Sequence, residues 1–321
     1  MSLNLRYVVS DTTDAYENLA TEEYLTFNVR EDECVLFLWQ NANTVVIGKN
    51  QNAWKECNVS LLEEASGKVA RRMSGGGAVY HDLGNLNFTF CAKKKNFDKE
   101  RQTKVILKAM KLLGVEALRS GRNDLLIEGK KFSGHAYFRH KDFCYHHGTI
   151  MFDVNKEDIA KYLNVSKEKL DSKGVNSVKS RVINIKEIND KITLRSLKVA
   201  LLEAFEKEYK GVATRCKTNE TSKELVDKYK SYEWIYGKDL PFTHEISNRF
   251  NWGEITVRVN VNEGFIKGCK CYTDALDVEL AHLVSESLIG ERYKIKDIYN
   301  CQKDEYEPMV NEVIRLVSEK I

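Results

Sequence analysis

The stretch RRMSGGGAVYHDLGN at residues 71–85 joins an arginine pair to three consecutive glycines. Glycine lacks a Cβ, so its amides can approach a ligand closely and its φ angle can be positive. A loop of this kind can surround an anion with N–H donors. Arg71 and Arg72 can add bidentate contacts to a phosphate or a carboxylate. The motif GxxxxGK[ST] is absent, so the loop is not a P-loop. Taken alone, three glycines are also typical of a tight β-turn.

A second group of candidates surrounds a predicted hairpin with its turn at Glu128-Gly129. Beside an anion-binding loop, the ammonium group of Lys131 can stabilise a phosphate and a developing oxyanion. Asp124 can hold Mg²⁺ or orient an incoming amine. In isolation, Lys131 would be interpreted as a surface lysine and Asp124 as a residue that starts a strand. Because the hairpin is short, we expect these two side chains to lie close together.

The sequence offers little support for a zinc site. The eight cysteines form no CxxC pair, and Cys269/Cys271 is a lone CxC motif. His146 and His147 are adjacent on a predicted strand, so they point to opposite faces and cannot simply share a metal. Free cysteines without an export signal fit a reducing cytoplasm.

The bulk composition limits the class of protein. A chain of 321 residues is long enough for two domains, and 42% hydrophobic residues support a proper core. Fifty basic and forty-seven acidic residues give a net charge of +3, which is too balanced to favour nucleic-acid binding. We find neither a signal peptide nor the ~18 consecutive apolar residues that a membrane span needs. These observations predict a cytoplasmic protein that binds neither nucleic acid nor membrane.

Hydrophobic periodicity predicts strands and helices that alternate along the first three quarters of the chain. A helix capped by Asp14 should run to about residue 27, and Gly114 should end another helix. The expected strands are 5–9, 35–39, 44–47, 78–80, 86–91, 125–127, 131–132 and 145–152, and the other helices are 60–65, 98–113, 159–163 and 194–209. A polar, glycine-containing loop is expected at 172–182.

A domain boundary is predicted near residues 237–247, which contain one of only two prolines. Beyond it, alternating apolar residues from Ile255 to Val261 predict a strand, Gly264 a turn, and Phe265–Tyr272 the returning strand. Two helices at about 276–288 and 309–320 complete a small ββα-type module. We therefore expect one domain at 1–242 and a second at 248–321.

Several motifs together resemble one known family. The motifs RRMSGGGAVYHDLGN, GRNDL, KKFSG, HHGT and KGVNSVKSRV occur in the order and approximate spacing of lipoate–protein ligases. The first motif is highly specific, and the others are individually weak but collectively strong. The resemblance runs from about residue 5 to the C-terminus, including EWIYGK at 233–238.

The resemblance implies an α+β fold, with a mixed β-sheet catalytic domain similar to biotin ligases and class II tRNA synthetases. It implies an enzyme that activates lipoate with ATP and Mg²⁺ to lipoyl-AMP. The lipoyl group would then pass to a lysine of an acceptor lipoyl domain, such as the glycine-cleavage H protein or an E2 subunit of a 2-oxoacid dehydrogenase. Activation gives the carboxylate a good leaving group, so the enzyme needs positioning and charge stabilisation more than its own nucleophile. We expect a monomer.

The resemblance also implies roles for individual residues. Lys131 resembles the lysine that contacts the acyl carbonyl and the α-phosphate, and Arg72 resembles the arginine that meets nucleotide phosphate. Asp124 is the expected metal ligand. The remaining implied binding residues are Ser74, Gly75, Gly76, Gly77, Ala78, Val79, Tyr80, Asn85, Asn123 and His147. Residues 173–181 resemble a loop that closes over the adenylate and keeps water out. His81 also matches a family position, whereas His135 stands where small residues are frequent and could alter the pocket wall.

Two alternatives use the same fold. An acyltransferase would accept preformed lipoyl-AMP or octanoyl-carrier protein without an adenylation step, and octanoyltransferases tend to use a cysteine nucleophile. Cys91 and Cys144 lie in no motif that suggests one, and a buried inert thiol is the better interpretation of each. A non-catalytic nucleotide-binding protein is the second alternative, which the presence of Lys131 weakly disfavours.

Overall fold

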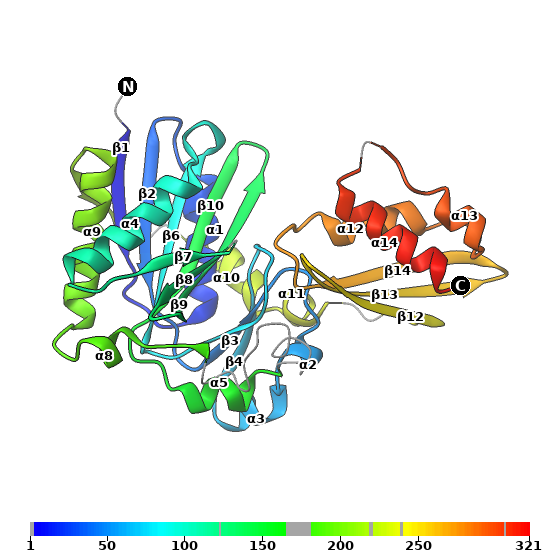
Figure 1. Ribbon diagram of the computed structural model, residues 1–321, viewed down its shortest axis with the longest axis horizontal. Helices are drawn as coiled ribbons and strands as arrows, with labels where there is room; N and C mark the ends of the chain where they lie inside the picture. Colours follow the sequence, from blue (N-terminus) through cyan, green and yellow to red (C-terminus); the bar gives the residue numbers. More distant parts are fainter. Residues whose placement is uncertain (1–2, 122, 165–180, 218–220, 238–239, 305) are drawn as a thin grey trace. The chain divides into compact units, whose positions relative to one another are not determined.

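The computed structural model describes residues 3–121, 123–164, 181–217, 221–237, 240–304 and 306–321 (Figure 1). The chain divides into two compact units, each assembled from segments that are distant in the sequence. Unit 1 comprises Met1–Val46, Trp54–Ala70 and Val79–Ile235, and unit 2 comprises Ile47–Ala53, Arg71–Ala78 and Tyr236–Ile321. The glycine-rich loop therefore groups with the C-terminal part of the chain. Of the predicted closing loop, only Arg181 lies within the described residues.

Unit 1 is built on an eight-stranded mixed sheet with the order β11-β1-β2-β6-β10-β9-β8-β7. Strand β1 runs parallel to β2 and β11, whereas the pairs from β2 onward are antiparallel. The strands are β1 (Asn4–Val9), β2 (Glu33–Trp39), β6 (Asn85–Lys93), β7 (Leu118–Ser120), β8 (Asp124–Ile127), β9 (Lys130–His140), β10 (Phe143–Met151) and β11 (Ala213–Arg215). This mixed sheet confirms the predicted fold class.

Helices cover both faces of this sheet (Figure 1). On one face, α4 (Lys99–Leu112) and α9 (Leu194–Tyr209) pack side by side over an apolar core. This core takes alternate residues of β6, namely Leu86, Phe88 and Phe90. On the other face, α1 (Ala15–Phe27) contacts β6 and β10. Because side chains alternate along a strand, the odd-numbered residues of β6 face α1.

The helix ends show why these segments fold locally. The carboxylate of Asp14 accepts hydrogen bonds from the amides of Tyr16 and Glu17 and so caps α1, which confirms the predicted start. Asp98 caps α4 in the same way through the Arg101 amide. Gly114, with φ of 72°, follows the end of α4 as expected.

A separate three-stranded sheet has the order β4-β3-β5, and helix α5 contacts it through β5. Its strands are β3 (Thr44–Ile47), β4 (Lys68–Arg71) and β5 (Val79–His81). Among the described residues before 237, the remaining helical segments are α2 (Ala53–Glu56), α3 (Val59–Glu64), η1 (Lys94–Asn96), α5 (Lys156–Tyr162), α8 (Ile185–Ile188), α10 (Lys223–Lys230) and α11 (Tyr232–Tyr236). No helix in the described ranges has the length and apolar character needed to cross a membrane.

The C-terminal part of unit 2 is an antiparallel sheet, β12-β13-β14, packed against helices around a separate apolar core. Its elements are β12 (His244–Phe250), β13 (Gly253–Asn262), β14 (Phe265–Thr273), α12 (Leu280–Leu288), α13 (Ile295–Tyr299) and α14 (Pro308–Glu319). The expected ββα pattern omitted β12. This edge strand buries only Ile246, so it lacks the apolar alternation by which a strand is recognised.

Candidate active site

Lys131 and Asp124 form an ion pair, with 2.7 Å between Nζ and Oδ1. The turn that joins β8 to β9 has positive φ angles at both Glu128 and Gly129, as a tight hairpin requires. A β-bulge then shifts the register, so Asp124 lies opposite Gly134. The expected proximity of the two side chains is confirmed. Both are partly exposed, which leaves the ammonium group accessible to a ligand.

The backbone of Lys131 is tied to the chain segment that follows residue 180. Its carbonyl accepts a hydrogen bond from the Ile183 amide at 3.0 Å, and it forms a parallel bridge with Val182. The guanidinium of Arg181 lies 4.0 Å from the second carboxylate oxygen of Asp124. The last residue of the predicted closing loop is therefore fixed beside the lysine–aspartate pair.

Gly134 provides the space that the Lys131 ammonium group occupies. A Cβ at Gly134 would lie 2.7 Å from Nζ and 2.8 Å from Cε of Lys131. The Gly134 amide donates to Oγ1 of Thr149 on β10 at 3.3 Å. Any side chain at position 134 would therefore compete with the lysine amine for one location.

Asn123 holds the start of β8 against β9 rather than leaving its amide free. Its Nδ2 donates to the carbonyl of His135 at 3.1 Å, and its own carbonyl accepts from the His135 amide at 2.8 Å. These two bonds position the neighbouring Asp124.

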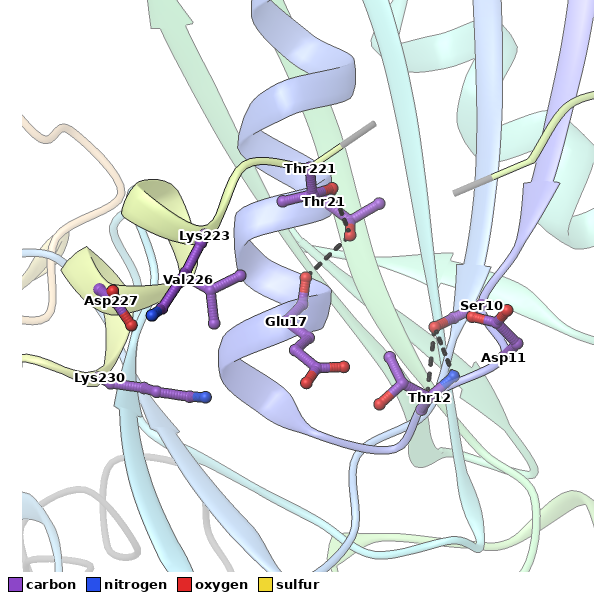
Figure 2. A pocket seen from close by; sticks show the side chains of 10 residues that line it. All are labelled: Ser10, Asp11, Thr12, Glu17, Thr21, Thr221, Lys223, Val226, Asp227 and Lys230. Carbon is purple, nitrogen blue, oxygen red and sulfur yellow. Dashed lines mark hydrogen bonds between the residues drawn. The ribbon is translucent and has the colours of Figure 1, made fainter. Parts of the chain in front are cut away.

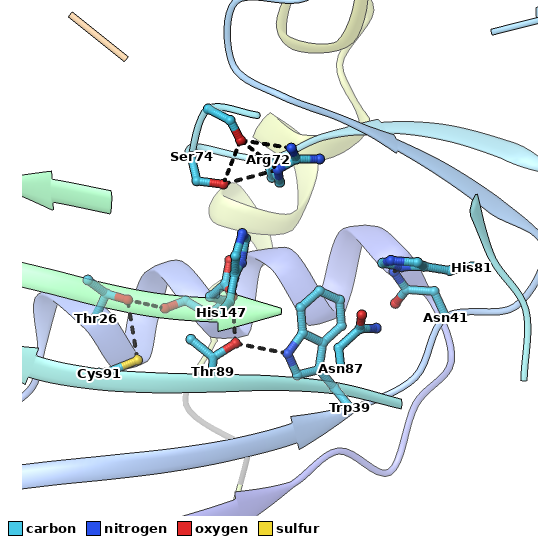
Figure 3. Close-up of polar contacts among 12 residues, drawn as sticks. Thr26, Trp39, Asn41, Arg72, Ser74, His81, Asn87, Thr89, Cys91 and His147 are labelled. Carbon is cyan, nitrogen blue, oxygen red and sulfur yellow. Dashed lines mark hydrogen bonds and ion pairs between the residues drawn. The ribbon is translucent and has the colours of Figure 1, made fainter. Parts of the chain in front are cut away.

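Buried polar groups fill the layer between α1 and the sheet (Figure 3). Glu22 of α1, only 1% exposed, accepts from Oγ1 of Thr89 at 2.6 Å and lies 2.8 Å from Nδ1 of His147. The indole of Trp39 donates to the same Thr89 oxygen at 3.0 Å. The structure thus places His147 in a network with Glu22, which the sequence analysis missed.

Asn85, another predicted binding residue, lies in the same layer. Its Nδ2 donates to Oδ1 of Asn87 at 2.9 Å. Nearby, Nδ2 of Asn41 lies 3.1 Å from Nδ1 of His81. These amides and imidazoles are almost fully buried, so each must find a partner in the protein or in a bound molecule.

His146 and His147 point to opposite faces of the sheet, as predicted. Nδ1 of His146 lies 3.1 Å from Oε1 of Gln102 on α4, and its Nε2 lies 2.9 Å from Nδ1 of His135. His135 is therefore directed toward α4, on the face opposite Glu22, and its Nε2 contacts Ser133 Oγ. Burial lowers the pKa of His135 to about 3 and also lowers that of His146.

This buried histidine pair predicts an acid-sensitive fold. Above the ordinary pKa of about 6.5, the folded and unfolded chains both hold neutral imidazoles. Below pH 6.5, the imidazole of the unfolded chain binds a proton, whereas the imidazole of the folded chain stays neutral down to about pH 3. The free energy of unfolding therefore decreases as the pH is lowered through this range. We expect His135→Ser to lower the slope of unfolding free energy against pH by up to about 1.4 kcal/mol per pH unit. Urea unfolding between pH 4.5 and 8 measures this slope, with the exposed His140→Ser as the control. An unchanged slope in His135→Ser would contradict the assignment.

In unit 2, the glycine-rich loop packs on its own neighbours. Gly76 has a φ of 88°, and its amide donates to the carbonyl of Ala275 at 2.9 Å. A Cβ on Gly75 would lie 2.4 Å from that carbonyl oxygen, so both positions require glycine. The Gly76 amide is thus already used in this conformation.

Arg72 binds the same loop through its guanidinium group. Nη2 donates to the carbonyls of Gly75 and Gly77 at 2.7 and 2.8 Å. Nε donates to Ser74 Oγ at 3.0 Å, and Figure 3 shows these two side chains together. These contacts fix the curvature of the loop.

Arg71 has a structural role. Its Nη1 donates to the carbonyls of Gly48, Lys49 and Gln51 at distances of 2.7–3.0 Å. Burial lowers its pKa to about 10. Arg71 therefore holds the segment 48–51, and Arg72 is the member of the arginine pair that belongs to the predicted binding residues.

Ala78, Val79 and Tyr80 follow the loop, and the last two belong to β5. The Tyr80 hydroxyl donates to Oδ1 of Asn43 at 3.2 Å, and its ring lies 5.3 Å from that of Tyr162. The backbone of this segment pairs with β3, which gives it the extended conformation that was predicted.

The two thiols considered as nucleophiles are poorly suited to that role. Cys91 and Cys144 are both fully buried, and burial raises the pKa of each thiol. A catalytic cysteine needs the opposite, an exposed thiol with a lowered pKa.

A cavity of about 400 Å³ lies beside α1 and α10 (Figure 2). Charged groups of both signs line it. The lining residues are Ser10, Asp11, Thr12, Glu17, Thr21, Thr221, Lys223, Val226, Asp227 and Lys230. None of the predicted site residues is among them, so this cavity is separate from the lysine–aspartate pair.

Comparison with known families identifies the class of this protein. Residues 14–206 match the family described as lipoyl protein ligase A/B catalytic domain. Residues 239–311 match the bacterial lipoate protein ligase C-terminus. The chain belongs to the lipoate–protein ligase family.

Named relatives agree over nearly the whole chain. It is 38% identical to lipoate-protein ligase A of Blochmanniella pennsylvanica, across 94% of this chain and 92% of the relative. It is 39% identical to lipoate-protein ligase A of Bdellovibrio bacteriovorus, across 90% and 89%.

Two solved structures are similar to this chain. The chain is similar to P. falciparum LipL1 in complex with lipoate, with a TM-score of 0.86, 32% identity and coverage of 98% of this chain and 99% of that one. It also shares its fold with a lipoate-protein ligase A bound with ATP, with a TM-score of 0.65, 21% identity and coverage of 73% and 99%.

Proposed function

We propose that this chain is an ATP-dependent lipoate–protein ligase, which converts lipoate to lipoyl-AMP and transfers the lipoyl group to a lysine of an acceptor lipoyl domain. The observation that carries the proposal is the partly exposed Lys131–Asp124 pair within a chain of this family. LipL1 was solved with lipoate and a fold relative with ATP, which supports these two substrates.

Lys131 is the proposed catalytic residue. Its ammonium group would contact the acyl carbonyl and the α-phosphate, where negative charge develops in both half-reactions. A preorganised cation at this location stabilises such charge without reorganisation during the reaction. Asn123 would position Asp124, and His147, held by Glu22, would line the bound acyl group together with Asn85.

In unit 2, we assign nucleotide binding to Arg72, Ser74 and the loop that they shape. The bonds from Arg72 to the loop carbonyls support this, because they hold the loop in one conformation before a ligand arrives. Gly75, Gly76, Gly77, Ala78, Val79 and Tyr80 complete the set carried over from the family motif.

A magnesium ion fits Asp124 as a single protein ligand. Within the described ranges, no group of three or more His, Cys, Asp or Glu side chains could hold a metal. Mg²⁺ bound with ATP usually takes one or two carboxylates and completes its shell with phosphates and water. The bound ion would neutralise phosphate charge, and Asp124 would hold it.

The proposal also covers the acceptor of the lipoyl group and the compartment in which the protein acts. An archaeal relative was solved as a bipartite ligase with its E2 lipoyl domain, which supports a lipoyl domain of an E2 subunit or H protein as the acceptor here. We propose that the chain acts in the cytoplasm as a monomer.

Lipoate-dependent exchange of pyrophosphate into ATP tests the adenylation step. We expect exchange that requires both lipoate and the chain, followed by lipoyl transfer to an added E2 lipoyl domain. The alternative without adenylation predicts no exchange but intact transfer from synthetic lipoyl-AMP. A chain that shows neither exchange nor transfer would support the non-catalytic alternative.

A further inference from the structure

The buried side-chain nitrogen of Asn87 has no hydrogen-bond partner in the described part of the chain. Asn87 is only 2% exposed, and its Oδ1 is already bonded to Asn85. A buried amide donor without a partner is costly, so native structures seldom keep one unless a ligand or water satisfies it.

Two residues beside Asn87 already have hydrogen-bond partners within the protein (Figure 3). Trp39 lies directly opposite Asn87 across β2 and β6, and its indole nitrogen is bonded to Thr89. Thr89 in turn is bonded to Glu22. Since Trp39 and Thr89 are bonded to each other and to Glu22, they do not use the Asn87 amide, which can donate to a bound molecule.

A row of residues across the sheet connects Asn87 with Lys131. Asn87 pairs with Thr149 on β10, and Thr149 Oγ1 accepts from the amide of Gly134 on β9. Lys131 places its ammonium group over Gly134. Residues opposite one another in a ladder point to the same face, so Asn87 and this ammonium group lie on the α1 face of the sheet.

The two ends of this row of residues differ in charge and burial in the way that a carboxylic acid with an apolar tail requires. Its Lys131 end is partly exposed and charged, whereas its Asn87 end is buried. Strands β6 and β9 are two spacings apart, or about 9.5 Å. An extended lipoate chain, from its carboxyl group to its dithiolane ring, has the right length to bridge this span.

We propose that Asn87 donates a hydrogen bond to a dithiolane sulfur of lipoate and thereby selects lipoate over octanoate. The inference rests on the proposed function of Lys131, which fixes the carboxyl end. A ring sulfur is a weak acceptor, but octanoate has none and would leave the amide unpaired. A site built to donate to its substrate rejects an analogue that lacks the acceptor.

The test compares lipoate with octanoate in ATP–pyrophosphate exchange by the full chain. We expect the wild type to prefer lipoate, and Asn87→Leu to lower the ratio of the two kcat/KM values by about tenfold. Octanoate activity should rise in absolute terms, because the unpaired amide is gone. Loss of the Asn85–Asn87 bond affects both substrates and cancels in the ratio. Damage to the fold alone would lower both activities.

Thr26→Val is the matched control, because Thr26 is fully buried in the same layer and has its partners in Glu22 and Cys91. This variant should keep the wild-type ratio. Asn87→Ser, together with equilibrium binding of each acid, covers the case in which Asn87→Leu folds poorly. An unchanged ratio in both Asn87 variants would overturn the inference and indicate a water at the amide. Absence of exchange with either acid in the wild type would instead overturn the proposed function.

Discussion

Lys131→Ala is expected to lower kcat for lipoate adenylation by about 10²–10³, equivalent to about 2.7–4 kcal/mol of transition-state stabilisation. The ammonium group is the donor proposed to meet the charge that develops on the acyl and phosphate oxygens. Transfer from synthetic lipoyl-AMP should fall as well, because the acyl carbonyl becomes an oxyanion again when the acceptor lysine attacks. Single-turnover measurements of both half-reactions check this expectation.

The stability of Lys131→Ala should stay close to that of the wild type. Lys131 and Asp124 are 27% and 18% exposed, and ion pairs with this degree of exposure contribute about 1 kcal/mol or less. Lys130→Ala removes the same charge from the neighbouring exposed position and is the matched control. Wild-type turnover in Lys131→Ala would disprove the assignment of Lys131 as the catalytic residue.

The lysine–aspartate pair could be predicted because its geometry is local. Asp124 and Lys131 are joined by one short hairpin, and Glu128-Gly129 is a sequence typical of its turn. Likewise, α1 and α9 follow from capping residues and apolar spacing close to each helix. Interactions within about ten residues leave clear patterns in the sequence.

The polar layer under α1 could not be predicted in this way. Asn18, Glu22 and Thr26 recur every four residues, which is the pattern of a solvent-exposed stripe. The structure turns this stripe toward β6 and β10, where Glu22 meets Thr89 and His147. These partners are more than sixty residues away, and periodicity does not show which face of a helix meets water.

The glycine-rich loop illustrates a second limit. Its glycines were interpreted as an anion-binding loop, and the need for Gly75 and Gly76 follows in part from the backbone of Ala275, two hundred residues later. A run of glycines shows that this backbone approaches another group closely, but it does not show whether that group is a ligand or a distant part of the chain. The same holds for the contact of His135 with His146, since both look like ordinary strand residues.

Gly134→Ala is expected to reduce kcat by about a hundredfold while leaving the fold intact, because a displacement of about 1 Å in a catalytic group can have that effect. The added methyl group would occupy the position of the Lys131 amine. That amine is the far end of a flexible side chain, and its partly exposed ion pair with Asp124 contributes about 1 kcal/mol or less, so it can move aside at small energetic cost. Alanine also suits a strand better than glycine by roughly 0.5–1 kcal/mol, so thermal stability should be equal or slightly higher.

A double-mutant cycle separates this effect from general damage to the strand. If Gly134 acts only by leaving room for the amine, Gly134→Ala should cause no further loss of activity in a Lys131→Ala background. Gly211→Ala is the control, because its new methyl group would meet another flexible side-chain end, Leu5 Cδ1 at 3.2 Å. Additive losses in the double mutant would show that Gly134 acts on something other than Lys131. An active and normally folded Gly134→Ala single mutant would show that the amine does not need this location, and the reaction would then have to tolerate a lysine that reaches the substrate from elsewhere.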